Sequence, residues 1–178
     1  EKYSEGLIAL VGGVESRLAH LLINQNLEQF DNHVKWLQTT FKDDLFFSVS
    51  RHAMSQKALA EDGVETQTWL LQKMLGANQL EKDLETALLK ASKKFGISCV
   101  ATHGIYYLDK EDFKAHEILV NVATGEPCEI YERDDYGKVL ESTLNPKRRV
   151  MDSYEHYFKS PKEMQDLFFD LPEALALS

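Results

Sequence analysis

The segment from Ile97 to Glu117 constrains the fold of this chain more than any other. It opens with an apolar run over Ile97–Thr102, which is typical of a buried strand, and continues through polar residues around His103. A helical pattern follows over about Glu111–Val122. Where parallel strands alternate with helices, functional residues gather at the carboxyl ends of the strands. The segment therefore predicts a parallel α/β fold and marks one strand end as a candidate site.

Two further apolar runs, Leu7–Val11 and Leu45–Ser50, predict strands of the same buried, parallel kind. The segments between the strands have apolar residues at helical spacing. They predict four helices: Glu15–Leu22, Leu27–Phe41, Gln56–Leu75 divided near Gly63, and Leu80–Phe95 closed by Gly96.

Residues 123–159 form an irregular loop and hairpin segment. A turn at Asp134–Gly137 joins Glu129–Tyr131 to Lys138–Leu140, which predicts a small surface hairpin. After this segment, Ser160 precedes Pro161 and Glu163 in the pattern of a capping box, which predicts the start of a helix. One more helix is expected to begin at Pro172.

The composition limits the possible partners. The chain has 178 residues, 43% of them hydrophobic, and a net charge of -9, which fits one folded domain that does not grip nucleic acid by itself. No apolar run reaches the roughly 20 residues of a membrane span. The two cysteines, Cys99 and Cys128, lie far apart, and a reducing, cytoplasmic setting is expected. The basic triplet Lys147–Arg149 is interpreted as a solvated loop, with a phosphate contact as the alternative.

Three parallel strands cannot close a barrel. The chain begins without methionine and reads as part of something longer. Either upstream strands complete the fold, or the open sheet edges pair with another copy.

Five segments in order resemble the second half of the polymerase-and-histidinol-phosphatase (PHP) domain of the alpha subunit of bacterial DNA polymerase III: Gly6–Gly13, Val100–Thr102, Leu108–Glu117, Lys159–Met164 and Asp170–Leu175. The resemblance implies an α/β fold that is part of a distorted (β/α)7 PHP-type barrel, with parallel strands and helical cover. Residues 1–178 would be the later part of one such domain, whose N-terminal strands are missing. Residues 56–78 and 125–149 would be inserts of unassigned role.

The resemblance also implies where metal ligands would stand. Metal-binding members have a cysteine, a glutamate, an aspartate and a histidine at positions occupied here by Gly13, Ser48, Gly104 and Tyr106. His52 alone is retained. The alignment therefore predicts a degenerate site with no catalytic, cofactor-binding or metal-binding residue.

Two histidines keep the metal question open. His52 is either a residual ligand or a polar residue after a strand, and His103 is either a shifted replacement ligand or a loop residue. His116 is interpreted as a structural hydrogen-bonding residue. The nearby carboxylates are interpreted as helix-capping and helix-dipole residues: Asp109, Glu111, Asp112 and Glu117.

The resemblance implies a fragment of a cytoplasmic replicative DNA polymerase, a DNA-directed nucleotidyltransferase. The parent enzyme would use magnesium and meet DNA and dNTPs through other domains, whereas this fragment would be catalytically silent and hold no cofactor. Its expected partners are the other domains of the alpha subunit and the proofreading exonuclease subunit. The alternative is a metal-dependent phosphoesterase, either a 3′–5′ exonuclease or a pyrophosphatase.

Overall fold

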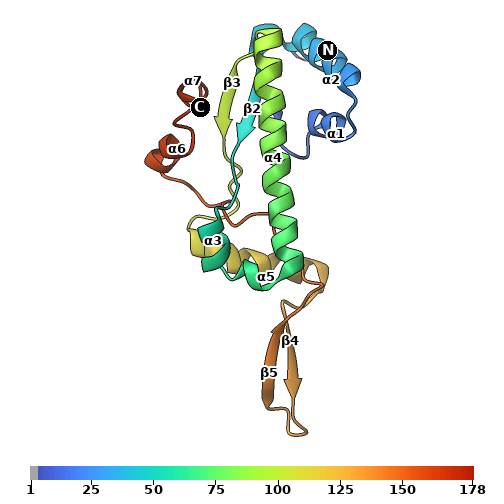
Figure 1. The fold of residues 1–178 in the computed structure, drawn as a ribbon, viewed down its shortest axis with the longest axis vertical. Coiled ribbons are helices and arrows are strands. Elements are labelled where there is room, and N and C mark those ends of the chain that lie inside the picture. The colour runs from blue at the N-terminus through green and yellow to red at the C-terminus, as the bar shows by residue number, and fades with distance from the viewer. Residues whose placement is uncertain (1–3) are drawn as a thin grey trace. The chain divides into compact units, whose positions relative to one another are not determined.

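The computed structural model describes residues 4–178, which form two compact units. Unit 1 comprises the chain up to Ala53, Met74–Gly104 and Lys159–Ser178, and unit 2 comprises Met54–Lys73 and Ile105–Phe158. The fold is a mixed α/β one, as the sequence predicts, with a parallel three-stranded sheet (Figure 1). The larger barrel and the assignment to one domain stay predictions.

The sheet of unit 1 has the order β1-β2-β3, with strands β1 (Ala9–Gly12), β2 (Leu45–Ser50) and β3 (Cys99–Thr102). Both pairings are parallel, so the three carboxyl ends lie at the same edge. Gly12 allows the close approach of β1 to β2, because a Cβ there would lie 2.0 Å from the carbonyl oxygen of Ser48. The candidate strand end after β3 therefore lies beside the end of β2.

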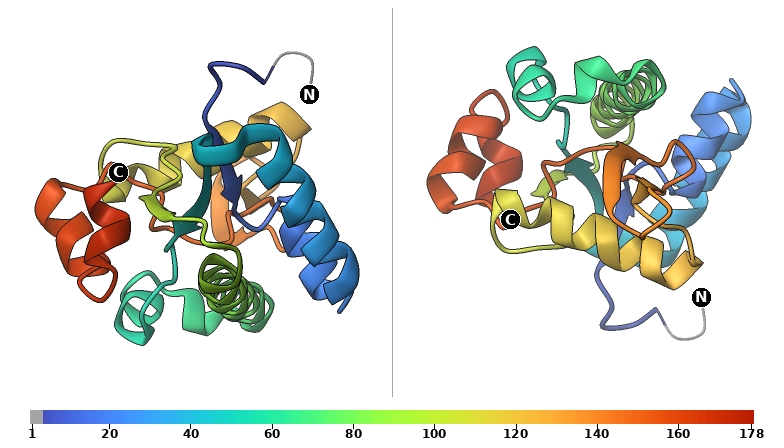
Figure 2. Two further views of the ribbon diagram at one scale, coloured as in Figure 1. Left: turned by 90° about the horizontal axis from the view of Figure 1, so that it is seen from above. Right: turned by 90° about the horizontal axis from the view of Figure 1, so that it is seen from below.

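The helices of unit 1 pack on the face of the sheet that bears Leu45, Phe47 and Val49, all at most 3% exposed. These helices are α1 (Arg17–Ile23), α2 (Leu27–Phe41), most of α4 (Thr68–Phe95), α6 (Pro161–Leu167) and α7 (Pro172–Ala176). Figure 2 shows α1 and α2 (blue) on the β1 side of the sheet and α6 and α7 (red) on the β3 side. The predicted capping box at Ser160 is confirmed.

Two details differ from the sequence-based expectation. The run Leu7–Val11 was expected to be buried, but β1 is an edge strand, and Leu7, Ile8 and Leu10 are each more than half exposed. Residues 68–95 form one continuous helix with Gly76 in its interior, where two separate helices were expected. An exposed glycine costs a helix about 1 kcal/mol relative to alanine, which the packed turns on either side can offset.

Unit 2 contains α3 (Gln56–Glu61), the start of α4 through Lys73, α5 (Phe113–Thr124) and a hairpin of β4 (Glu129–Arg133) with β5 (Val139–Leu144), together with short 3-10 turns at Val64–Thr66 and Lys110–Asp112. A third such turn, Lys42–Asp44, precedes β2 in unit 1. The hairpin is confirmed, and its antiparallel strands are exposed along their whole length. Asp109 and Asp112 form a capping box before α5, as expected.

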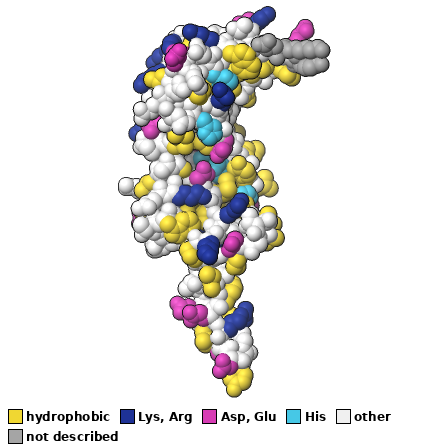
Figure 3. All heavy atoms as spheres, turned by 90° about the vertical axis from the view of Figure 1, so that its right-hand side faces the viewer, with side chains coloured by type: hydrophobic (Ala, Val, Ile, Leu, Met, Phe, Trp, Pro, Cys, Tyr) yellow, Lys and Arg dark blue, Asp and Glu magenta, His cyan; other side chains and the backbone are white. Residues whose placement is uncertain are grey.

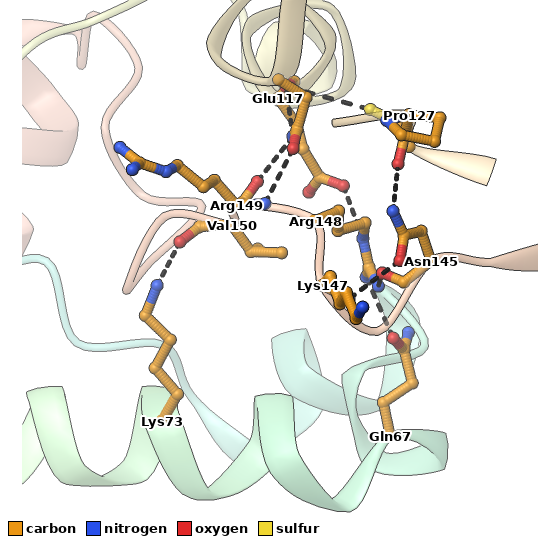
Figure 4. A network of polar contacts seen from close by, with 11 residues as sticks. Gln67, Lys73, Glu117, Pro127, Asn145, Lys147, Arg148, Arg149 and Val150 are labelled. Carbon is orange, nitrogen blue, oxygen red and sulfur yellow. Dashed lines mark hydrogen bonds and ion pairs between the residues drawn. The ribbon is translucent and has the colours of Figure 1, made fainter. Parts of the chain in front are cut away.

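Arg148 organises the loop after the hairpin, which corrects the interpretation of this residue as part of a solvated loop. It is 5% exposed, and its guanidinium donates to Glu117 at 2.8 Å, Gln67 at 2.9 Å and the Asn145 carbonyl at 3.2 Å (Figure 4). The same group lies over the ring of Trp69. The neighbouring Lys147 and Arg149 side chains are exposed.

Replacing Arg148 with Ala should lower the free energy of unfolding by about 3 kcal/mol, because the Glu117 carboxylate, whose side chain is 13% exposed, would stay largely buried without its partner. Arg149→Ala, a change of the same charge at the next residue, should alter it by less than about 0.5 kcal/mol. Urea unfolding of both variants measures the difference. Equal losses would show that Arg148 is no more than a surface cation.

Arg51 joins three parts of unit 1 at the end of β2. Its guanidinium donates to Glu85 of α4 at 2.5 and 2.9 Å, to Asp170 at 2.6 and 3.0 Å, and to the Leu167 carbonyl at 2.6 Å. It also lies over the Phe168 ring, which is fully buried. These hydrogen bonds raise the pKa of Arg51, with the bond to Glu85 as the largest cause, and lower the pKa of Asp170.

The Asp170 bond should make stability depend on acid pH. Because the folded-state pKa lies below the ordinary 3.8, the stabilisation is present above that value and is lost as pH falls through the folded-state pKa. The difference in unfolding free energy between wild type and Asp170→Asn should therefore be constant above about pH 5 and should shrink below the ordinary aspartate pKa of 3.8. Urea titrations at several pH values test this, with Asp166→Asn on exposed α6 as the control. A difference that grows in acid would contradict the assignment.

Candidate functional site

The carboxyl end of β2 places His52 in a set of contacts within unit 1. The Glu81 carboxylate of α4 accepts from the His52 backbone N–H at 2.7 Å and lies 2.9 Å from its ring Nδ1. On the other side, the backbone N–H of Gly104 donates to Nε2 at 2.9 Å. The ring of His103 stacks on His52 with 4.4 Å between centroids. Three residues, two that follow β3 and one from α4, thus surround the imidazole at the end of β2.

These bonds define the state of the His52 ring. An N–H donor at Gly104 requires Nε2 to be the acceptor, so the proton of a neutral ring lies on Nδ1 and is donated to Glu81. A metal ion needs an imidazole lone pair, and in this arrangement the only one is taken by Gly104. His52, for which the sequence left a ligand role open, thus connects the β3 end to the β2 end.

The sheet positions beside this histidine carry small hydroxyl side chains. Ser48 and Thr102 share a hydrogen bond of 2.7 Å between Oγ and Oγ1 across β2 and β3. Gly13 follows β1 with a φ of +79°, which favours glycine, and has no side chain to offer. These groups are poor ligands for the metals of hydrolytic sites.

Tyr106 and His116 belong to unit 2 and contact each other there. Their ring centroids are 5.5 Å apart, and Tyr106 also packs edge-on against His156 at 5.0 Å. The Tyr106 backbone N–H donates to the His156 carbonyl at 2.9 Å. His116 was expected to act through hydrogen bonds, but in the part of the chain that the structure describes its Nδ1 has no such partner. Its contacts are with aromatic rings, including that of Tyr107.

Within residues 4–178 no three His, Cys, Asp or Glu side chains are grouped in a way that could hold a metal ion. None of the helices described there is long and apolar enough to cross a bilayer. Cys99, at the start of β3, is partly buried, and this burial raises the pKa of its thiol.

Sequence reasoning missed the partners of the strand end. Glu81 and Glu85 stand four residues apart, so they share one face of α4, and they receive the consecutive residues His52 and Arg51. The available signal was the spacing of the two glutamates at i and i+4 in a predicted helix, together with two consecutive basic residues, Arg51 and His52, directly after a predicted strand.

Replacing His52 with Ala should lower the free energy of unfolding by about 2 kcal/mol, because two ring hydrogen bonds are lost, one of them to a carboxylate. Thermal or urea unfolding measures the change, and His20→Ala on the exposed side of α1 is the matched control. An unaltered stability would mean that the imidazole contacts are not part of the folded structure in solution.

Comparison with known proteins relates the chain to a segment of one large enzyme subunit. It is 39% identical over 175 residues to DNA polymerase III subunit alpha of Chlamydia pneumoniae, and 35% identical over 176 residues to that of Chlamydia muridarum. The corresponding protein of Borreliella burgdorferi is 26% identical over 175 residues. These matches cover 98 to 99% of this chain but only 12 to 13% of each relative. No family model matches the chain.

The chain is therefore homologous to a segment of proteins named DNA polymerase III subunit alpha.

Proposed function

We propose that this chain is the later part of the PHP domain of a replicative DNA polymerase alpha subunit, and that it acts there as a metal-free scaffold. The observation that carries the proposal is the closed environment of His52, whose ring nitrogens contact Glu81 and Gly104. The one side chain retained at a ligand position thus serves to connect β2, β3 and α4.

The polymerase role rests on the relatives. Proteins named DNA polymerase III subunit alpha match nearly the whole chain, which supports a part in DNA replication. Template-directed nucleotide transfer, with magnesium as the metal and dNTPs as substrates, would be carried out by parts of the polypeptide outside this chain. The net charge of -9 fits this division, because a DNA-binding surface needs basic residues.

Two features of unit 1 support the proposed scaffold role. Strand β1 is an open edge whose Leu10 is 53% exposed, and the face of β2 that bears Phe46 and Ser48 is only partly buried. Further strands of a PHP-type barrel would pair with that edge and cover that face. In this role the domain would support the rest of a cytoplasmic alpha subunit and dock a partner such as the proofreading exonuclease subunit.

The metal content of the full-length polypeptide tests the proposal. Purified without chelators, it should catalyse magnesium-dependent DNA synthesis on a primed template and contain much less than one equivalent of zinc, manganese or iron. His52→Ala should lower its melting temperature without reducing the rate of nucleotide incorporation at 25 °C.

Stoichiometric metal that is lost in His52→Ala but kept in His20→Ala would contradict the metal-free scaffold. If the metal-loaded protein also hydrolysed bis(p-nitrophenyl) phosphate, the phosphoesterase alternative would replace it. A polypeptide without DNA synthesis would contradict the polymerase assignment separately.

A further inference from the structure

Helix α5 exposes apolar side chains and buries a polar one. Ile118, Leu119 and Val122 are 53%, 67% and 71% exposed, whereas Asn121 is 1% exposed. A surface helix of a globular domain normally shows the reverse pattern. Its apolar face is therefore uncovered among the residues that the structure describes.

The orientation of α5 is set by the polar contacts of Asn121. Its side-chain amide donates to the carbonyls of Glu117 at 2.8 Å and Arg149 at 2.7 Å, and its oxygen accepts from the Arg149 backbone N–H at 2.8 Å. Since an unpaired buried amide would be costly, these three bonds strongly favour this face as the inner one. The outward direction of the apolar residues is thus built into unit 2.

The exposed face of α5 meets the base of the hairpin in a groove of about 330 Å³. Four apolar side chains and two carboxylates are among the residues that line it: Ile118, Val122, Pro127, Tyr131, Glu126 and Glu129. A groove of this volume can hold a few side chains of a peptide segment and is at the lower end of the range for small-molecule pockets. Combined apolar and acidic lining suits a segment with both apolar and basic residues.

Charge narrows the choice of occupant. Residues 126–141 contain six acidic and two basic side chains, and one of the basic ones, Arg133, lies over the Tyr131 ring. The hairpin, at the lower end of Figure 3, carries hydrophobic side chains among charged ones. A second copy of this chain or a nucleic acid would bring further negative charge to the groove, so both are disfavoured.

We propose that the groove between α5 and β4 docks a segment of a separate protein, with apolar side chains against Ile118 and Val122 and at least one Lys or Arg near Glu126 and Glu129. This proposal rests on the proposed function, in which the domain docks a partner protein. It adds the surface that binds the partner and the side-chain chemistry that the partner would present.

Site-specific crosslinking in the full-length polypeptide, expressed in its host, tests the groove. A benzophenone amino acid replaces Val122 in the groove or, as control, Tyr136, which is 96% exposed at the hairpin tip. Mass spectrometry should identify an adduct at position 122, absent at 136, with a peptide of another protein that has a Lys or Arg within a few residues of the crosslink. Glu126→Lys with Glu129→Lys should reduce its yield about tenfold.

The hairpin offers a control of equal charge on its other face. Glu132 and Glu141 are cross-strand neighbours on the face opposite to Glu129, so Glu132→Lys with Glu141→Lys should leave the adduct in place. An adduct only within the same polypeptide, an adduct equally sensitive to both charge reversals, or no adduct above the control would overturn the proposal. DNA synthesis and melting temperature, measured in the same variants, report separately on the polymerase and scaffold roles.

Discussion

The parallel pairing of β2 between β1 and β3 is the constraint on which unit 1 depends. Leu45, Phe47 and Val49 alternate along β2 and are almost completely buried, so a register slip of one residue would turn this whole set away from the helices. The in-register pairs Gly12 with Ser48 and Ser48 with Val100 then bring the carboxyl ends of all three strands to one edge.

The residues that follow β2 secure this edge. Arg51 reaches Glu85 and Asp170, while His52 reaches Glu81 and Gly104, so two consecutive side chains connect the strand end to α4, the C-terminal helices and the β3 end. Of the carboxylates that accept from them, Asp170 has a pKa lowered by its hydrogen bond to Arg51, so its contribution to stability is lost as the pH falls through the folded-state pKa. A strand end at which a barrel enzyme would hold its ligands is used here for cross-connections. This arrangement is the physical basis of the proposed scaffold role.

Much of this fold could be predicted from local patterns. The helix Leu27–Phe41 and the strand Leu45–Ser50 have the expected bounds, because their apolar periodicity is strong. The exposure of Leu10 on β1 could not be foreseen, since an apolar run has the same appearance in an edge strand and a central one. The burial of Arg148 could not be foreseen either, because its partners Gln67 and Glu117 are 81 and 31 residues away in the sequence. For the candidate site, the positions came from a family resemblance, whereas the use of Glu81 required the three-dimensional packing of α4.

The protonation pattern of His52 tests the central claim most directly. Side-chain ¹⁵N NMR of the full chain, recorded with and without added zinc, distinguishes a protonated ring nitrogen from a free or metal-bound one. The account predicts a neutral ring protonated on Nδ1, with Nε2 in a hydrogen bond and its resonance unchanged by zinc. A zinc-dependent shift of Nε2 to the position of a metal-bound nitrogen would contradict it.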